Sequence, residues 1–112
     1  IADASGRGVT GGSYIGEACL LEILSQIKRN YNIDDKKIYL WGFSNGAYAA
    51  INLLENYPDM FAGTFTLAAS SNHNLLCNIQ DKKCINIYSQ FDDSHKNKCF
   101  PENISAENFK DI

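Results

Sequence analysis

The stretch from Lys37 to Tyr48 constrains this chain more than any other. It reads as an apolar segment at residues 38–41, then Gly42-Phe43-Ser44-Asn45-Gly46, then an apolar helical pattern that begins at once. A strand that turns sharply into a helix at Ser44 lifts the hydroxyl clear of the sheet, beside backbone N–H groups that can hold an oxyanion. The turn is crowded, so we expect that a Cβ atom at position 42 or 46 would collide, which glycine avoids. The pattern predicts a nucleophilic Ser44; the alternative is a serine that N-caps an ordinary helix.

The segment from Tyr31 to Ala50 resembles the serine-hydrolase branch of the α/β-hydrolase fold. It is most similar to the polyhydroxybutyrate depolymerase, feruloyl esterase and esterase D-like group, which grades into prolyl-oligopeptidase-type peptidases. The glycine-rich segments Gly6-Arg7-Gly8, Gly11-Gly12 and Ile15-Gly16-Glu17 resemble that group's approach to the helix before the turn. The resemblance covers residues 6 to about 93, weakly in the last third, and its only specific motif is Gly-x-Ser-x-Gly. It implies a serine esterase that works through an acyl-enzyme without a cofactor.

Hydrophobic periodicity predicts alternating helices and strands. We expect helices at about 14–31 and 47–57, the second ended by Pro58, a short helix at 75–79, strands at 38–41, 61–69 and 84–88, and an irregular segment from Ser94 onward. The wholly apolar first strand is typical of a central parallel strand that is covered on both faces. This order predicts an α/β fold with a parallel sheet. With the resemblance, it indicates a three-layer αβα sheet, the central-to-C-terminal portion of an α/β-hydrolase fold.

The catalytic acid is expected just after the third strand. In this fold the triad follows the chain order serine, acid, histidine. The segment Ser89-Gln90-Phe91-Asp92 resembles the Gly-x-x-Asp of the family, with serine in place of glycine, and so assigns the acid to Asp92. Asp93 is a competitor, and both aspartates could instead belong to a solvated turn. For the oxyanion hole, the backbone N–H of Asn45 is the expected first donor, and the second normally comes from a loop earlier than anything in this chain.

The general base is not settled by the sequence. Both histidines, His73 and His95, lie outside the position at which the family has its histidine, which follows one further strand. His95 comes three residues after Asp92 and could reach Ser44 only through a folded-back loop. The simpler interpretation is that residues 1–112 form one partial domain from the middle of a larger hydrolase. The histidine and the second oxyanion donor would then lie outside the sequence shown.

Composition limits the partners. The 112 residues suffice for one globular domain and carry a net charge of -3, with no cluster of Lys or Arg. This argues against a nucleic-acid partner or an anionic membrane surface, and no apolar run approaches the ~20 residues of a membrane span. The resemblance implies a small-molecule ester or acyl substrate. The oligomeric state stays open, as does the location, cytoplasmic or secreted.

The four cysteines do not indicate a definite disulfide or metal site. Cys19 is expected as a small apolar core residue, whereas Cys77, Cys84 and Cys99 could form one disulfide. The pairs His73-x-x-x-Cys77 and His95-x-x-x-Cys99 repeat one spacing, but a zinc site usually has a Cys-x-x-Cys pair, which this sequence lacks. We therefore predict no metal site.

Two further interpretations of function stay open. The chain could belong to a serine peptidase of the prolyl-oligopeptidase type. It could also be a hydrolase-fold module that binds a ligand or partner without turning it over. The unplaced histidine and the serine at position 89 motivate this second possibility.

Overall fold

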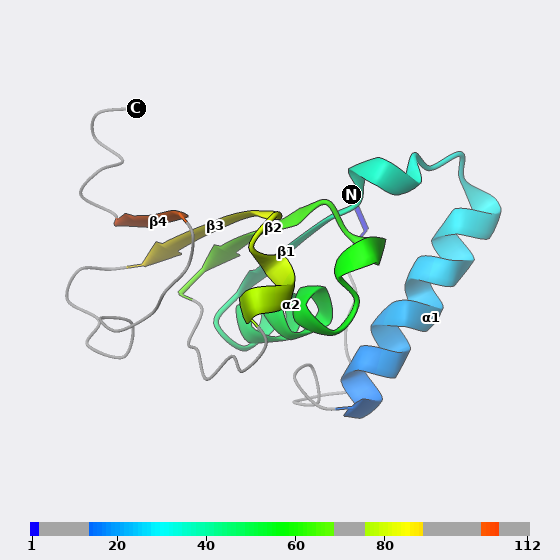
Figure 1. Cartoon of the computed structure of the whole chain (residues 1–112). Coiled ribbons are helices and arrows are strands. Elements are labelled where there is room, and N and C mark those ends of the chain that lie inside the picture. The colour runs from blue at the N-terminus through cyan, green and yellow to red at the C-terminus, as the bar shows by residue number, and fades with distance from the viewer. Residues whose placement is uncertain (3–13, 69–75, 89–101, 106–112) are drawn as a thin grey trace.

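The computed structural model describes residues 1–2, 14–68, 76–88 and 102–105. These residues form two α-helices, three short 3₁₀ helices and four strands (Figure 1). In chain order the elements are α1 (Tyr14–Asn30), η1 (Asp35–Lys37), β1 (Tyr39–Phe43), α2 (Asn45–Asn56), η2 (Pro58–Met60), β2 (Gly63–Leu67), η3 (Leu76–Ile79), β3 (Lys83–Tyr88) and β4 (Glu102–Ser105). The predicted alternation of helices and strands is confirmed. Pro58 follows the end of α2, as expected for a residue that cannot continue a helix.

The strands form one parallel sheet in the order β1-β2-β3-β4. Its register places Phe43 beside Leu67 and Leu67 beside Ile87. Since the strands are parallel and in register, β1, β2 and β3 end at the same edge of the sheet. This is the edge at which α/β proteins usually place functional groups.

The expectation of an irregular segment after Ser94 is wrong at residues 102–105. These residues form β4, which pairs with β3 from Ile85↔Glu102 to Tyr88↔Ser105. Its sequence, Glu-Asn-Ile-Ser, contains a single apolar residue and no strand pattern. The strand is defined by its backbone pairing with β3. The local sequence does not predict this pairing.

Helix α2 covers one face of the sheet. Its buried residues include Ala47, Ala50, Ile51 and Leu54. Small residues in the first turns let the helix lie close to β1, where Gly42 is buried beneath them. The core continues through Leu53 and Leu54 to Phe61, Ile79 and Cys84.

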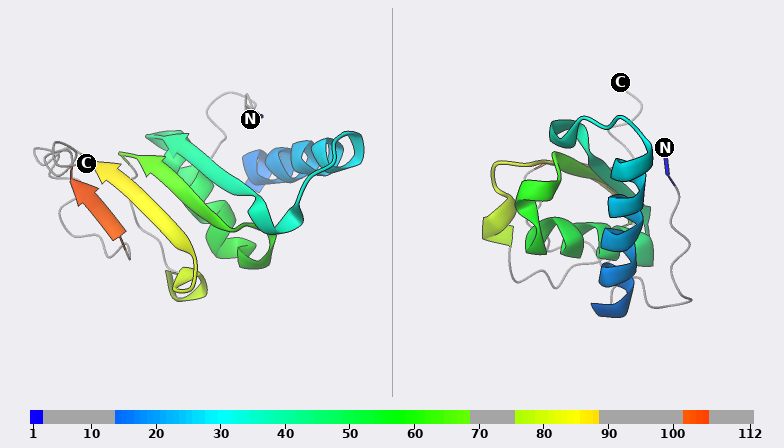
Figure 2. Two further views of the ribbon diagram at one scale, coloured as in Figure 1. Left: turned by 90° about the horizontal axis from the view of Figure 1, so that it is seen from above. Right: turned by 90° about the vertical axis from the view of Figure 1, so that its right-hand side faces the viewer.

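The opposite face is bare over β1. The side chains of Tyr39, Trp41 and Phe43 are 60%, 62% and 64% exposed, and that of Phe65 on β2 is 40% exposed. Seen from above, the strands lie in front of α2, and α1 lies beside the sheet on the β1 side (Figure 2). The prediction of a central strand covered on both faces is therefore wrong for the residues that the structure describes, because β1 is the edge strand. Within them α2 is the only helix over the sheet.

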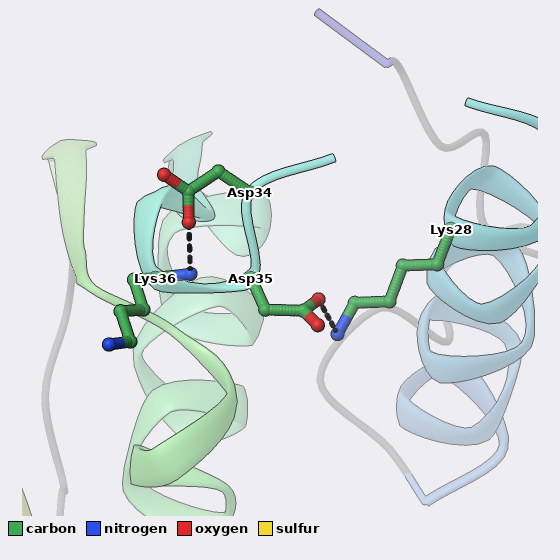
Figure 3. A network of polar contacts seen from close by, with 4 residues as sticks. All are labelled: Lys28, Asp34, Asp35 and Lys36. Carbon is green, nitrogen blue, oxygen red and sulfur yellow. Dashed lines mark hydrogen bonds and ion pairs between the residues drawn. The ribbon is translucent and has the colours of Figure 1, made fainter. Parts of the chain in front are cut away.

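Helix α1 is joined to β1 by a polar turn. The Lys28 ammonium lies 2.7 Å from a carboxylate oxygen of Asp35, and the Asp34 carboxylate accepts the backbone N–H of Lys36 at 3.0 Å (Figure 3). A side-chain oxygen of this kind, which bonds a backbone N–H two residues on, is typical of aspartate in turns. Cys19, expected in the core, is only half-buried on α1. Among the described helices, none combines the length and apolarity needed to cross a membrane.

Candidate active site

Ser44 is the single residue that joins β1 to α2. Its backbone has φ 52° and ψ -116°, a conformation that non-glycine residues rarely adopt. It occupies the N-cap position of α2, but its side chain makes no capping hydrogen bond, and the residue is exposed. An ordinary N-cap serine has an extended backbone and bonds a first-turn N–H group through its hydroxyl. The geometry therefore does not match the simple N-cap alternative.

The backbone of Ser44 is held at both ends. Its N–H donates to the carbonyl of Leu67 at 3.0 Å, and its own carbonyl accepts the N–H of Tyr48 at 3.1 Å. The first bond ties the turn to β2, and the second starts the helical ladder of α2. The side chain is thus presented from a backbone anchored to both elements.

Only one of the two flanking glycines is required by sterics. A Cβ atom on Gly42 would collide with the carbonyl group of Gly46 and lie 2.6 Å from the nitrogen of Ala47. The collision predicted at position 42 is confirmed. The one predicted at position 46 is wrong, because a Cβ atom there has no heavy atom within 4 Å. The close approach involves the backbone of Gly46, while the missing side chain would point into open space.

The first turn of α2 supplies N–H groups beside Ser44. Since the ladder begins with the N–H of Tyr48, those of Asn45, Gly46 and Ala47 precede it. The positive end of the helix dipole lies at the same place. Negative charge that developed near the Ser44 hydroxyl would be stabilised there. Asn45 is exposed, and its role as oxyanion donor remains a prediction.

The other predicted site residues lie outside the described residues. These are Asp92, Asp93, His73 and His95, together with Cys99 and the side chain of Cys77. In the part of the chain that the structure describes, no group of His, Cys, Asp and Glu could hold a metal ion.

Two buried polar features of the described residues, a hydrogen-bonded pair and a single glutamate, were not anticipated from the sequence. Thr66 on β2 donates its hydroxyl to the side-chain carbonyl of Asn86 on β3 at 3.1 Å, and both residues are at most 2% exposed. Thr66 pairs in register with Gly42, two positions before the turn. The signal that could have found this pair is the Thr-Phe-Thr alternation of β2, which places threonine beneath α2.

Glu55 is the second such feature. It lies in the last turn of α2, is 3% exposed, and burial raises its pKa to about 7. It lies eleven positions after Ser44 in the sequence, roughly 16 Å along the helix axis. Glu55 is therefore a feature of the packing of α2 and not a member of the candidate site.

A separate apolar groove of about 310 Å³ lies between α1 and β1. Leu20 and Leu24 of α1 line one side, and Ile38 and Leu40 line the other. Ser44 is not among its lining residues. The groove is therefore distinct from the candidate site.

The chain is similar over part of its length to a curated protein. The chain is 35% identical over 54 residues to poly(3-hydroxyalkanoate) depolymerase C of Paucimonas lemoignei. The match covers 47% of this chain and 13% of the relative, so the chain corresponds to a small part of that protein. No protein-family model matches the chain.

Proposed function

We propose that this chain carries the nucleophile of a serine hydrolase that cleaves carboxylic esters. The observation that carries the proposal is the turn at Ser44, where a non-glycine residue has φ 52° between a strand and a helix and its hydroxyl is not used for capping. Strained backbone of this kind is concentrated at functional sites. The local similarity to a depolymerase supports an ester as the substrate.

In this proposal the hydroxyl of Ser44 attacks the ester carbonyl and the alcohol leaves, forming an acyl-enzyme that water then hydrolyses. The backbone N–H of Asn45 donates to the oxyanion, an interaction worth about 3 kcal/mol of the barrier. A histidine must take the serine proton, since Ser44 is inert without it. That base is His95 or a histidine outside this chain, and Asp92 orients it, with Asp93 as the alternative.

The proposal also places residues 1–112 within a larger domain. They would be the central-to-C-terminal portion of a three-layer α/β-hydrolase fold. The bare face at Tyr39, Trp41 and Phe43 supports this placement, because all-parallel sheets are normally covered on both faces. A second helical layer over these aromatic residues would complete the sheet.

The test is covalent labelling of the full-length protein with a fluorophosphonate. We expect the label on Ser44 and its loss in Ser44→Ala, while Ser25→Ala, a serine on α1, keeps full labelling. Hydrolysis of p-nitrophenyl esters should be lost in the same variant. A folded wild-type protein that neither labels nor hydrolyses esters would overturn the proposal and favour a binding module.

A second assay tests whether the substrate is an ester or a peptide, by comparing hydrolysis of p-nitrophenyl esters with that of prolyl amides. If prolyl amides were cleaved at rates above those of p-nitrophenyl esters, the prolyl-oligopeptidase alternative would replace the esterase. The depolymerase similarity favours the ester. Both assays use the same Ser44→Ala control. The preference for an ester or an amide is therefore tested independently of the identity of the nucleophile.

A further inference from the structure

A second left-handed residue lies beside Ser44. Among the residues that the structure describes, Ser44 and Ala68 are the two non-glycine positions with positive φ, each at 52°. Ala68 directly follows β2, as Ser44 directly follows β1. Since Phe43 pairs with Leu67, the two residues occupy equivalent positions on neighbouring strands, about 4.8 Å apart.

One peptide group connects the two turns. The carbonyl of Leu67 accepts the N–H of Ser44 at 3.0 Å, and the N–H of Ala68 donates to the carbonyl of Ile87 at 2.8 Å. The Leu67 carbonyl and the Ala68 N–H belong to the same planar peptide unit. This unit therefore bridges β1 and β3 at the level of Ser44. Any rotation of its plane would break one bond or the other.

The φ angle of Ala68 is the torsion adjacent to this peptide plane. Glycine would reach φ 52° without steric cost, whereas alanine does so against the clash of its Cβ atom. Such a conformation persists when the surrounding bonds determine it. Here the surrounding bonds include the hydrogen bond from the Ser44 N–H to the Leu67 carbonyl, which holds the backbone of Ser44.

We infer that Ala68 is a positioning residue for Ser44. It acts through the Leu67–Ala68 peptide group, which fixes the Ser44 backbone and hence the direction of its hydroxyl. The N–H of Ala68 is engaged with Ile87, so the residue acts without donating to the substrate. This inference rests on the proposed function of Ser44.

The experiment replaces Ala68 with glycine in the full-length protein. Ala68→Gly keeps the peptide group and its bonds but frees the torsion that orients them. We expect kcat for p-nitrophenyl esters, and the rate of fluorophosphonate labelling, to fall roughly tenfold, because small misplacements of a nucleophile are costly. KM should stay unchanged, since no group that contacts the substrate is removed.

Ala62→Gly, just before the start of β2, is the matched control. It should lower the thermal midpoint by about 4 °C and leave labelling unchanged, because glycine has more freedom in the unfolded chain. In Ala68→Gly the relief of strain offsets that loss, so the midpoint should not fall. A labelling rate that is lower in Ala68→Gly than in Ala62→Gly, while both are folded, supports the inference, and a rate that is equal or higher overturns it.

The outcomes separate the two proposals. If wild type labels at Ser44 and Ala68→Gly labels at the same rate, the positioning role is overturned and the hydrolase proposal stands. If the folded wild type does not label at all, the hydrolase proposal fails, and the role of Ala68 fails with it.

Discussion

Gly42 lies in close contact with the first turn of α2. Its missing side chain is replaced by the backbone of α2, because the carbonyl group of Gly46 and the nitrogen of Ala47 occupy the space of a Cβ atom. Backbone atoms at a helix start cannot rotate away as a flexible side chain could. The turn at Ser44 therefore requires glycine at position 42, because any larger side chain would collide with the backbone of α2.

Gly42→Ala and Gly46→Ala make a matched pair. We expect Gly42→Ala to lower the free energy of unfolding by about 3 kcal/mol or more, since the added methyl group must push α2 away from β1. Gly46→Ala meets open space within a helix and should stay within about 1 kcal/mol of wild type, on the stabilising side. Urea denaturation followed by circular dichroism measures both changes. Equal losses in the two variants would contradict the geometry of the turn.

Helix α2 begins beside the candidate nucleophile and ends at a buried glutamate. Its first turn presents backbone N–H groups beside Ser44, and its last turn buries Glu55 against the η3 region, where the Asn78 amide donates to the Glu55 backbone carbonyl at 3.1 Å. Burial raises the pKa of Glu55 to about 7 from an ordinary 4.5. A carboxyl group with a raised pKa is held in its neutral form, so the packing of α2 is coupled to pH.

Glu55→Gln tests that coupling. Below about pH 4.5 the carboxyl group is protonated in both the folded and unfolded states and makes no pH-dependent contribution. As pH rises towards 7 the unfolded chain releases the proton first, so wild-type stability falls relative to the variant, by up to about 3 kcal/mol. Denaturation at pH 4.5 and pH 8 should show this gap opening. Glu22→Gln, an exposed glutamate on α1, should show no such change.

At the scale of the whole molecule, the sheet is covered unevenly. Helix α2 lies over one face of the sheet (Figure 2). The aromatic residues of β1 are exposed on the other face. Exposed apolar patches of this kind usually mark contact surfaces. The proposed larger domain would account for the patch with a second layer of helices.

Trp41 reports on this face directly, because it is the sole tryptophan in the sequence. In the 112-residue chain its side chain is 62% exposed, so its fluorescence should resemble that of tryptophan in water and be quenched efficiently by acrylamide. In the full-length protein we expect the part of the emission that Trp41→Phe removes to be blue-shifted and more weakly quenched. An indole equally quenched in both proteins would argue against a covering layer.

The sequence alone determined the local features of this protein. The helices, three of the strands and the glycine at position 42 follow from periodicity, helix-ending residues and short-range sterics, which depend on near neighbours in the chain. Tertiary structure decided the rest: the pairing of β4, the bare face of β1, the positive φ of Ala68 and the raised pKa of Glu55. Each of these features depends on contacts with residues that are distant in the sequence. A pattern of neighbouring residues cannot predict such contacts.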